Sequence, residues 1–130
     1  MIEVAMVGTA DLRAVKSFYA SVGYNCELGA TDRILVARET VTIVAAVRLS
    51  AERDNLVLHG MYVSRALRGT GIGSQLLSRA SSEIGLSVCW CVPYTHLEYF
   101  YSRIGFRAPS VGETPLGRIQ DRTVSVLIKP

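Results

Sequence analysis

Apolar residues recur along the 130-residue chain with two different spacings. An apolar residue at every third or fourth position predicts amphipathic helices, and this spacing occurs at residues 12–22, 71–84 and 97–104. Short runs rich in β-branched and other apolar residues predict strands, which we place at residues 2–7, 34–37, 41–49, 56–63, 86–92 and 122–128. The polar segment at residues 50–55 is expected to be a turn between two of these strands.

The order of these elements predicts the fold class. One strand, a helix, three strands, and then alternating helices and strands indicate an α/β or α+β domain built on a mixed sheet. The uninterrupted apolar run at residues 86–92 is typical of a strand that is buried on both faces. No linker rich in Pro, Gly or Ser divides the chain, so residues 1–130 are expected to form a single domain.

Composition narrows the class of protein. Hydrophobic residues make up 49% of the chain and the formal net charge is +3, which excludes intrinsic disorder. No apolar run approaches the roughly 20 residues that span a bilayer, and the first residues lack the basic and apolar regions of a secretory signal. The three cysteines, Cys26, Cys89 and Cys91, do not form an even disulfide framework, so we expect a reducing, cytoplasmic location.

The charge is unevenly distributed. Residues 55–82 contain no Asp or Glu but include Arg65, Arg68 and Arg79. Local positive charge without nearby acids suits a polyphosphate. It is too small for a nucleic-acid footprint, which needs a clustered basic stripe.

A glycine-rich loop lies between a predicted strand and a predicted helix. It reads Arg68-Gly69-Thr70-Gly71-Ile72-Gly73. Glycines at a helix start leave backbone N–H groups open to an anion, although a tight turn packed on glycines is the simpler alternative. A P-loop would require a lysine followed by Ser or Thr, and a dinucleotide fingerprint would require glycines directly after the strand. The loop satisfies neither pattern.

The loop resembles motif A of the GNAT superfamily of N-acetyltransferases, Arg/Gln-x-x-Gly-x-Gly/Ala, with Arg68, Gly71 and Gly73 at those positions. Residues 100–106, Phe-Tyr-Ser-Arg-Ile-Gly-Phe, are similar to the family's C-terminal signature, Phe/Leu-Tyr-x-x-x-Gly-Phe. The resemblance covers residues 56–106. It implies a mixed, mostly antiparallel sheet of six or seven strands, flanked by about three helices and split between the fourth and fifth strands.

The resemblance also implies an acetyl-CoA site without a metal. The pantetheine arm would pair like an added strand with Met61, Tyr62 and Val63. Tyr94 stands where the family often has an asparagine that contacts CoA. The pyrophosphate would bind the amides of the glycine loop: Arg68, Gly69, Thr70, Gly71, Ile72, Gly73 and Ser74.

The resemblance further implies acetyl transfer from acetyl-CoA to a primary amine, by direct attack in a ternary complex. The amine would belong to a small molecule or, as a second choice, to a peptide. Tyr101 matches the family's general acid, although its place on an apolar helix face also suits a packing tyrosine. His59 is the one titratable candidate for the base in residues 55–82, and a structural histidine is the alternative.

Other candidates point to structure rather than chemistry. Cys89 and Cys91 lie within an apolar run, which favours core positions over a metal site or a nucleophile. Arg48 is expected to be a solvated strand end, or else to face an acidic group on the acceptor.

Two other functions remain open at this point. A non-catalytic acyl-CoA sensor would need neither Tyr101 nor a base. A toxin that acts on charged tRNA would need more positive charge. The expected partners are acetyl-CoA and an amine, without nucleic acid or membrane, for a monomer or a homodimer.

Overall fold

A single sheet runs through the molecule. The computed structural model describes residues 1–29, 31–52, 54–113 and 125–130. Neighbouring strands are antiparallel except for β4 and β5, which run parallel. The expected mixed, mostly antiparallel sheet is therefore confirmed. Residues 122–124 of the last predicted strand lie outside the described residues, which contain six strands in chain order: β1 (Ile2–Met6), β2 (Arg33–Glu39), β3 (Thr42–Glu52), β4 (Asn55–Val63), β5 (Cys89–Cys91) and β6 (Leu127–Lys129).

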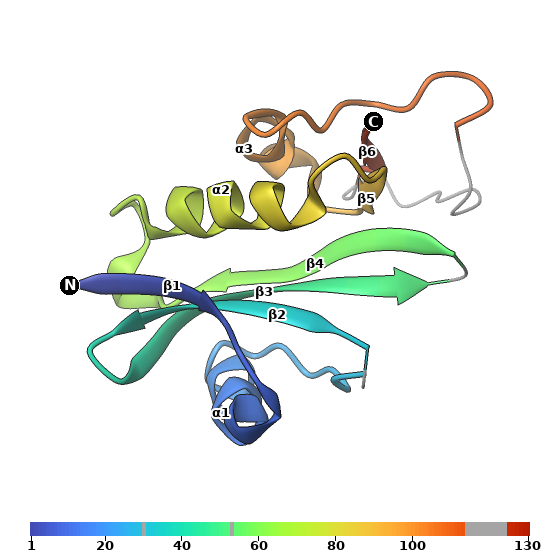
Figure 1. Cartoon of the computed structure of the whole chain (residues 1–130). Coiled ribbons are helices and arrows are strands. Elements are labelled where there is room, and N and C mark those ends of the chain that lie inside the picture. The colour runs from blue at the N-terminus through green and yellow to red at the C-terminus, as the bar shows by residue number, and fades with distance from the viewer. Residues whose placement is uncertain (30, 53, 114–124) are drawn as a thin grey trace.

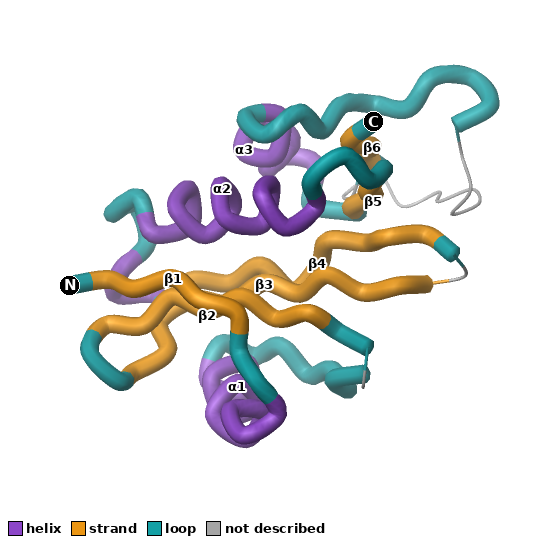
Figure 2. The backbone as a smooth tube through the Cα atoms, in the orientation of Figure 1, coloured by secondary structure: helices purple, strands orange, loops and turns teal. Residues whose placement is uncertain are grey.

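Helices cover both faces of the sheet (Figures 1 and 2). Helix α1 (Leu12–Ser21) lies on one face and α2 (Ile72–Ile84) on the other. The third helix, α3 (Glu98–Ser102), follows a 3-10 turn at Thr95–Leu97 and is shorter than the predicted helix. Each face has its own apolar core, because the buried sides of α1 and α2 pack against opposite faces of the same strands.

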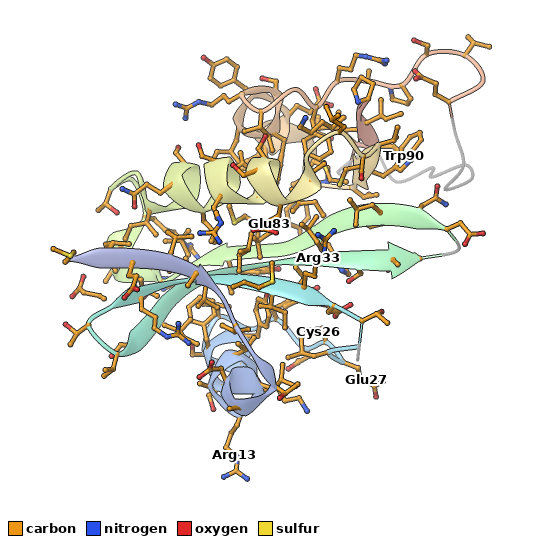
Figure 3. The ribbon with its side chains drawn as sticks, viewed as in Figure 1. Arg13, Cys26, Glu27, Arg33, Glu83 and Trp90 are labelled. Atoms are coloured by element: carbon orange, nitrogen blue, oxygen red, sulfur yellow. The ribbon has the colours of Figure 1, made fainter. Side chains whose placement is uncertain are left out.

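The last turn of α2 is held to the sheet by Arg33 on β2. Its Nη1 donates a hydrogen bond to the Glu83 carbonyl at 3.4 Å, and Figure 3 shows the two residues facing one another between the helix and the sheet. A cation at a helix C-terminus is favourable, because it meets the unpaired carbonyls of the last turn.

Two further sequence predictions were wrong in their boundaries. The turn predicted at residues 50–55 is shorter, because β3 continues to Glu52 and β4 starts at Asn55. The run at residues 86–92 has only three strand residues, since β5 pairs, among the described residues, with Leu56–Leu58 and Leu127–Lys129 alone. Outside that ladder the apolar residues are exposed, and Leu86 is fully so.

A bulge in β4 separates the half of the strand that pairs with both β3 and β5 from the half that pairs with β3 but not with β5. Register against β3 shifts between Ala46 and Arg48, so that one residue of β3 faces two of β4. Gly60 lies in this bulge with φ 65°, and a Cβ there would come within 3.0 Å of the Tyr19 hydroxyl. Only glycine suits both constraints. Pairing with β5 ends at Leu58, so the sheet opens beyond the bulge, as the expected split requires.

Candidate active site

The glycine loop has a backbone conformation that favours glycine at two positions. Gly69 and Gly71 have φ angles of 79° and 90°, in the left-handed region that favours glycine. Gly71 caps α2, and the first helical amide that finds a helix carbonyl is that of Gln75, bonded to Gly71 at 3.1 Å. The amides of the first turn therefore point out of the helix end, where the dipole favours an anion.

A cavity of about 660 Å³, here called the larger cavity to distinguish it from a smaller one that adjoins it, lies between this loop, β4 and α3. It brings together most of the residues predicted to bind the cofactor. Two of them are absent from its lining: Thr70, which bonds the Leu67 carbonyl, and Ile72, whose side chain is buried in the core. Their backbone amides still lie in the loop and at the start of α2. The predicted residues that do line the larger cavity are Met61, Tyr62, Val63, Arg68, Gly69, Gly71, Gly73, Ser74, Tyr94 and Tyr101.

Two arginines flank the N-terminal end of α2. Arg68 donates from Nε to the Val63 carbonyl at 3.2 Å, which ties the loop to the end of β4. Arg103 donates to the Ser74 hydroxyl in the first turn of α2 at 3.1 Å. Sequence reasoning missed Arg103, since it lies 29 residues beyond Ser74 and only the packing of α3 on α2 brings them together. Both side chains are exposed, so their charge is available to an anion at the helix end.

A smaller cavity of about 340 Å³ adjoins the larger one. Of these two cavities, the larger one is not lined by Tyr24 or His59, which line the smaller one beside the sheet face that α1 covers. The two cavities meet where β4 and β5 diverge, so a molecule in one could reach a molecule in the other. The residues common to both linings are Met61, Tyr62, Tyr94, Leu97 and Tyr101.

Tyr101 lies at this junction and is only 6% exposed. Its ring packs edge-to-face against Phe100 and Phe106, with centroids 5.1 and 6.1 Å away. Burial, followed by the nearby thiol Cys91, raises the pKa of the Tyr101 hydroxyl above its ordinary value of 10. The packing role and a hydroxyl that stays protonated at neutral pH thus coexist in one side chain.

His59 is half-buried on β4, and its Nε2 lies 2.6 Å from the Ser50 hydroxyl. The Ser50 hydroxyl in turn lies 2.6 Å from Oδ1 of Asp32. Burial lowers the pKa of His59 below 6.5, and the positive charge of Arg48 adds to this effect, while Glu52 and Asp32 oppose it. The imidazole is consequently neutral at physiological pH.

The interpretation of Arg48 as a solvated strand end was wrong. Its side chain is 7% exposed and pairs with Asp32, Nη2 to Oδ2, at 2.6 Å. It also donates to the Tyr24 hydroxyl at 3.0 Å and to the Glu27 carbonyl at 3.1 Å. Arg48 is buried because the segment between α1 and β2 supplies these three partners, which a linear pattern does not reveal.

The cysteines have the structural character that the sequence predicted. Cys89 and Cys91 are buried free thiols on β5, and burial raises the pKa of Cys89 to about 12. Thiols that stay protonated are poor nucleophiles. Among the described residues, no group of three or more His, Cys, Asp or Glu side chains is arranged to hold a metal ion.

Comparisons with known proteins agree with this geometry. Residues 30–108 match the family model for the acetyltransferase (GNAT) domain. A search of curated proteins found no match. No helix in the described ranges has the length and apolar character needed to cross a membrane.

Solved structures with the same fold include several acyltransferases. Escherichia coli ElaA is similar at 20% identity and a TM-score of 0.79, over 100% of both chains. An acyl-CoA N-acyltransferase from Pseudomonas aeruginosa is similar at 18% identity and a TM-score of 0.73, over 100% of this chain and 99% of that one. Arabidopsis thaliana Naa50, in complex with the bisubstrate analogue CoA-Ac-MVNAL, is similar at 19% identity and a TM-score of 0.68, over 99% of this chain and 98% of that one.

The split sheet, the glycine loop at the start of α2 and the family match agree with one another. This chain belongs to the GNAT acetyltransferase family and is an acyltransferase.

Proposed function

We propose that the chain transfers the acetyl group of acetyl-CoA to the primary amine of a small molecule. The observation that carries this proposal is the meeting of two cavities at the split between β4 and β5, with Tyr101 at the junction. Two cavities that share a wall can hold a donor and an acceptor together, which direct transfer in a ternary complex needs. A binding-only sensor would have no use for the second cavity.

The larger cavity suits the CoA donor. Its pyrophosphate would accept hydrogen bonds from the first-turn amides of α2, with Arg68 and Arg103 nearby. The pantetheine arm would lie along Met61–Val63, where β4 has lost its strand partner on the β5 side within the described part of the chain. Naa50, whose solved complex contains CoA joined to a peptide, has the same fold.

The smaller cavity suits the acceptor. At about 340 Å³ it falls within the range of small-molecule sites, which favours a compact amine over a long peptide. His59 lines it and is the one residue of its lining whose neutral form can take a proton near neutral pH. We therefore assign His59 as the general base.

The proposed reaction balances in protons. His59 takes one proton from the ammonium group, and the freed nitrogen lone pair attacks the thioester carbonyl, forming the C–N bond. A backbone N–H of Met61–Val63 would stabilise the oxyanion. When the C–S bond breaks, the Tyr101 hydroxyl donates to the sulfur, and it recovers a proton from the nitrogen that becomes the amide.

The test is a screen of primary amines with acetyl-CoA, followed by release of the CoA thiol. We expect direct binding of acetyl-CoA by calorimetry, and thiol release that depends on the amine. Binding of acetyl-CoA without amine-dependent release across aliphatic, aromatic and peptide amines would favour the sensor. Failure to bind acetyl-CoA would reject the proposed donor site.

A further inference from the structure

The hydrogen bonds around Ser50 have a single consistent direction. A hydroxyl has one hydrogen to donate and two lone pairs to accept with. Ser50 is 2.6 Å from the Asp32 carboxylate and 2.6 Å from Nε2 of His59. An ionised carboxylate can only accept, so the Ser50 hydrogen goes to Asp32, and Nε2 of His59 must donate to the Ser50 oxygen.

Asp32 is held in the ionised form that this direction requires. Burial opposes ionisation, but hydrogen bonds from Ser50, Arg48 and the Gly29 amide outweigh it, so the pKa of Asp32 lies below its usual value of 3.8. Its side chain is 5% exposed, which shields these bonds from water. Arg48 is therefore the positive charge that holds the Asp32 carboxylate, the hydrogen-bond acceptor for Ser50, in place.

We propose that Ser50 and Asp32 are positioning residues, which hold His59 in the tautomer that carries its proton on Nε2 and leaves Nδ1 to take the proton of the acceptor amine. The proposal rests on the proposed function, in which His59 is the base. Because β3 and β4 are paired at Arg48–His59 and at Ser50–Val57, Ser50 and His59 both lie on paired strands, and Asp32 directly precedes β2. None of the described residues bonds Nδ1, whereas Nε2 is engaged.

Charged and titratable groups surround the ring from several elements. Arg48 and Glu52 on β3 act on it with opposite signs, and Asp32 before β2 acts through Ser50. Tyr24, from the loop after α1, lines the same cavity. A histidine in such surroundings could adopt either tautomer, so the Ser50 contact decides which nitrogen acts as the base.

The first experiment needs no substrate. The chain has two histidines, so two-bond proton–nitrogen NMR spectra show two imidazole rings, and a His96→Gln variant assigns them. We expect wild-type His59 to be a single tautomer protonated at Nε2. We expect Ser50→Ala to give a tautomer mixture, and its His59 to titrate at lower pH, because the oxygen that stabilises the imidazolium is lost. A wild-type ring protonated at Nδ1, or a mixture, overturns the proposal even if Ser50→Ala does not fold.

A matched control separates positioning from general damage. Ser21→Ala also removes a 2.6 Å hydroxyl hydrogen bond, to the Phe18 carbonyl on α1, outside both cavities. It should leave the tautomer of His59 unchanged and kcat/KM within about twofold. Ser50→Ala should lower kcat/KM by about tenfold or more for the fastest amine of the screen, as a part of the 10²–10⁴-fold that a general base contributes.

A double variant tests whether Ser50 acts through His59. In a His59→Gln background, adding Ser50→Ala should change kcat/KM by less than about twofold, because the group that Ser50 positions is already gone. Equal losses in both backgrounds would overturn the proposal. Acetyl-CoA affinity should be unchanged in the Ser21, Ser50 and His59 variants. A wild type that neither binds acetyl-CoA nor releases thiol instead rejects the proposed function, whatever tautomer is observed.

Discussion

Replacing Gly71 with alanine should separate an anion site from a merely structural turn. A Cβ at Gly71 would meet no described atom within 4 Å, so crowding contributes nothing. The cost comes from the φ of 90°, which an alanine adopts at about 1–2 kcal/mol. We expect the melting temperature to fall by about 3–10 °C.

Gly71→Ala should weaken the binding of acetyl-CoA more than it lowers the stability of the fold. Relief of the strained φ would rotate the first amides of α2 away from the larger cavity. Each charge-assisted hydrogen bond to a phosphate oxygen is worth about 1.5–3 kcal/mol, so loss of one should raise the Kd for acetyl-CoA by about 10–100-fold. Calorimetry at a temperature where the variant is fully folded measures this directly.

Gly73→Ala is the matched control, since it makes the same chemical change two residues later. A Cβ there would lie 3.5 Å from Phe100 and from Val63, which is ordinary contact, and the residue is helical. The helix should gain up to about 1 kcal/mol, with Kd within about threefold of wild type. The reasoning is refuted if folded Gly71→Ala binds acetyl-CoA like the wild type, or if both variants lose equal affinity.

Three further predictions follow from the buried groups. Tyr101→Phe should lower kcat without changing the affinity for acetyl-CoA. The high-pH limb of the rate profile should stay in place, because burial puts the pKa of the Tyr101 hydroxyl above 10. An unchanged kcat would mean that Tyr101 has a packing role alone. A thiol reagent should modify only half-buried Cys26 in the native chain, and all three cysteines after denaturation. Cys89 and Cys91 are buried, and the pKa of Cys89 is raised to about 12. Rapid labelling of a second cysteine in the native chain would contradict this. Asp32→Asn should have a lower free energy of unfolding than the wild type at pH 7. In urea unfolding this difference should shrink as pH falls below about 4, since the folded pKa of Asp32 lies below 3.8 and its stabilisation is lost when it protonates. A difference in the free energy of unfolding that does not depend on pH would contradict the ion pair.

Much of the molecule followed from local pattern alone. The helical spacing at residues 71–84 and the glycines before it predicted α2 and its cap, because helix periodicity and positive φ are properties of neighbouring residues. The two motifs also pointed to the family that the comparisons show. Cys89 and Cys91 could be assigned to the core because the strand around them is apolar on both faces.

Only the tertiary structure decided how the candidate base is supported. Ser50 looked like a turn residue because polar residues follow it, but long pairing of β3 with β4 extends both strands past it and buries it to 5% exposure. The sequence did not reveal that Asp32 and Arg48 pair, since they lie 16 residues apart and the other partners of Arg48 lie 21 and 24 residues away. Contacts between residues so far apart depend on how the loops pack over the sheet, and hydrophobic periodicity does not predict that packing. The junction of the two cavities arises in the same way, from a bulge and a strand pair that ends early.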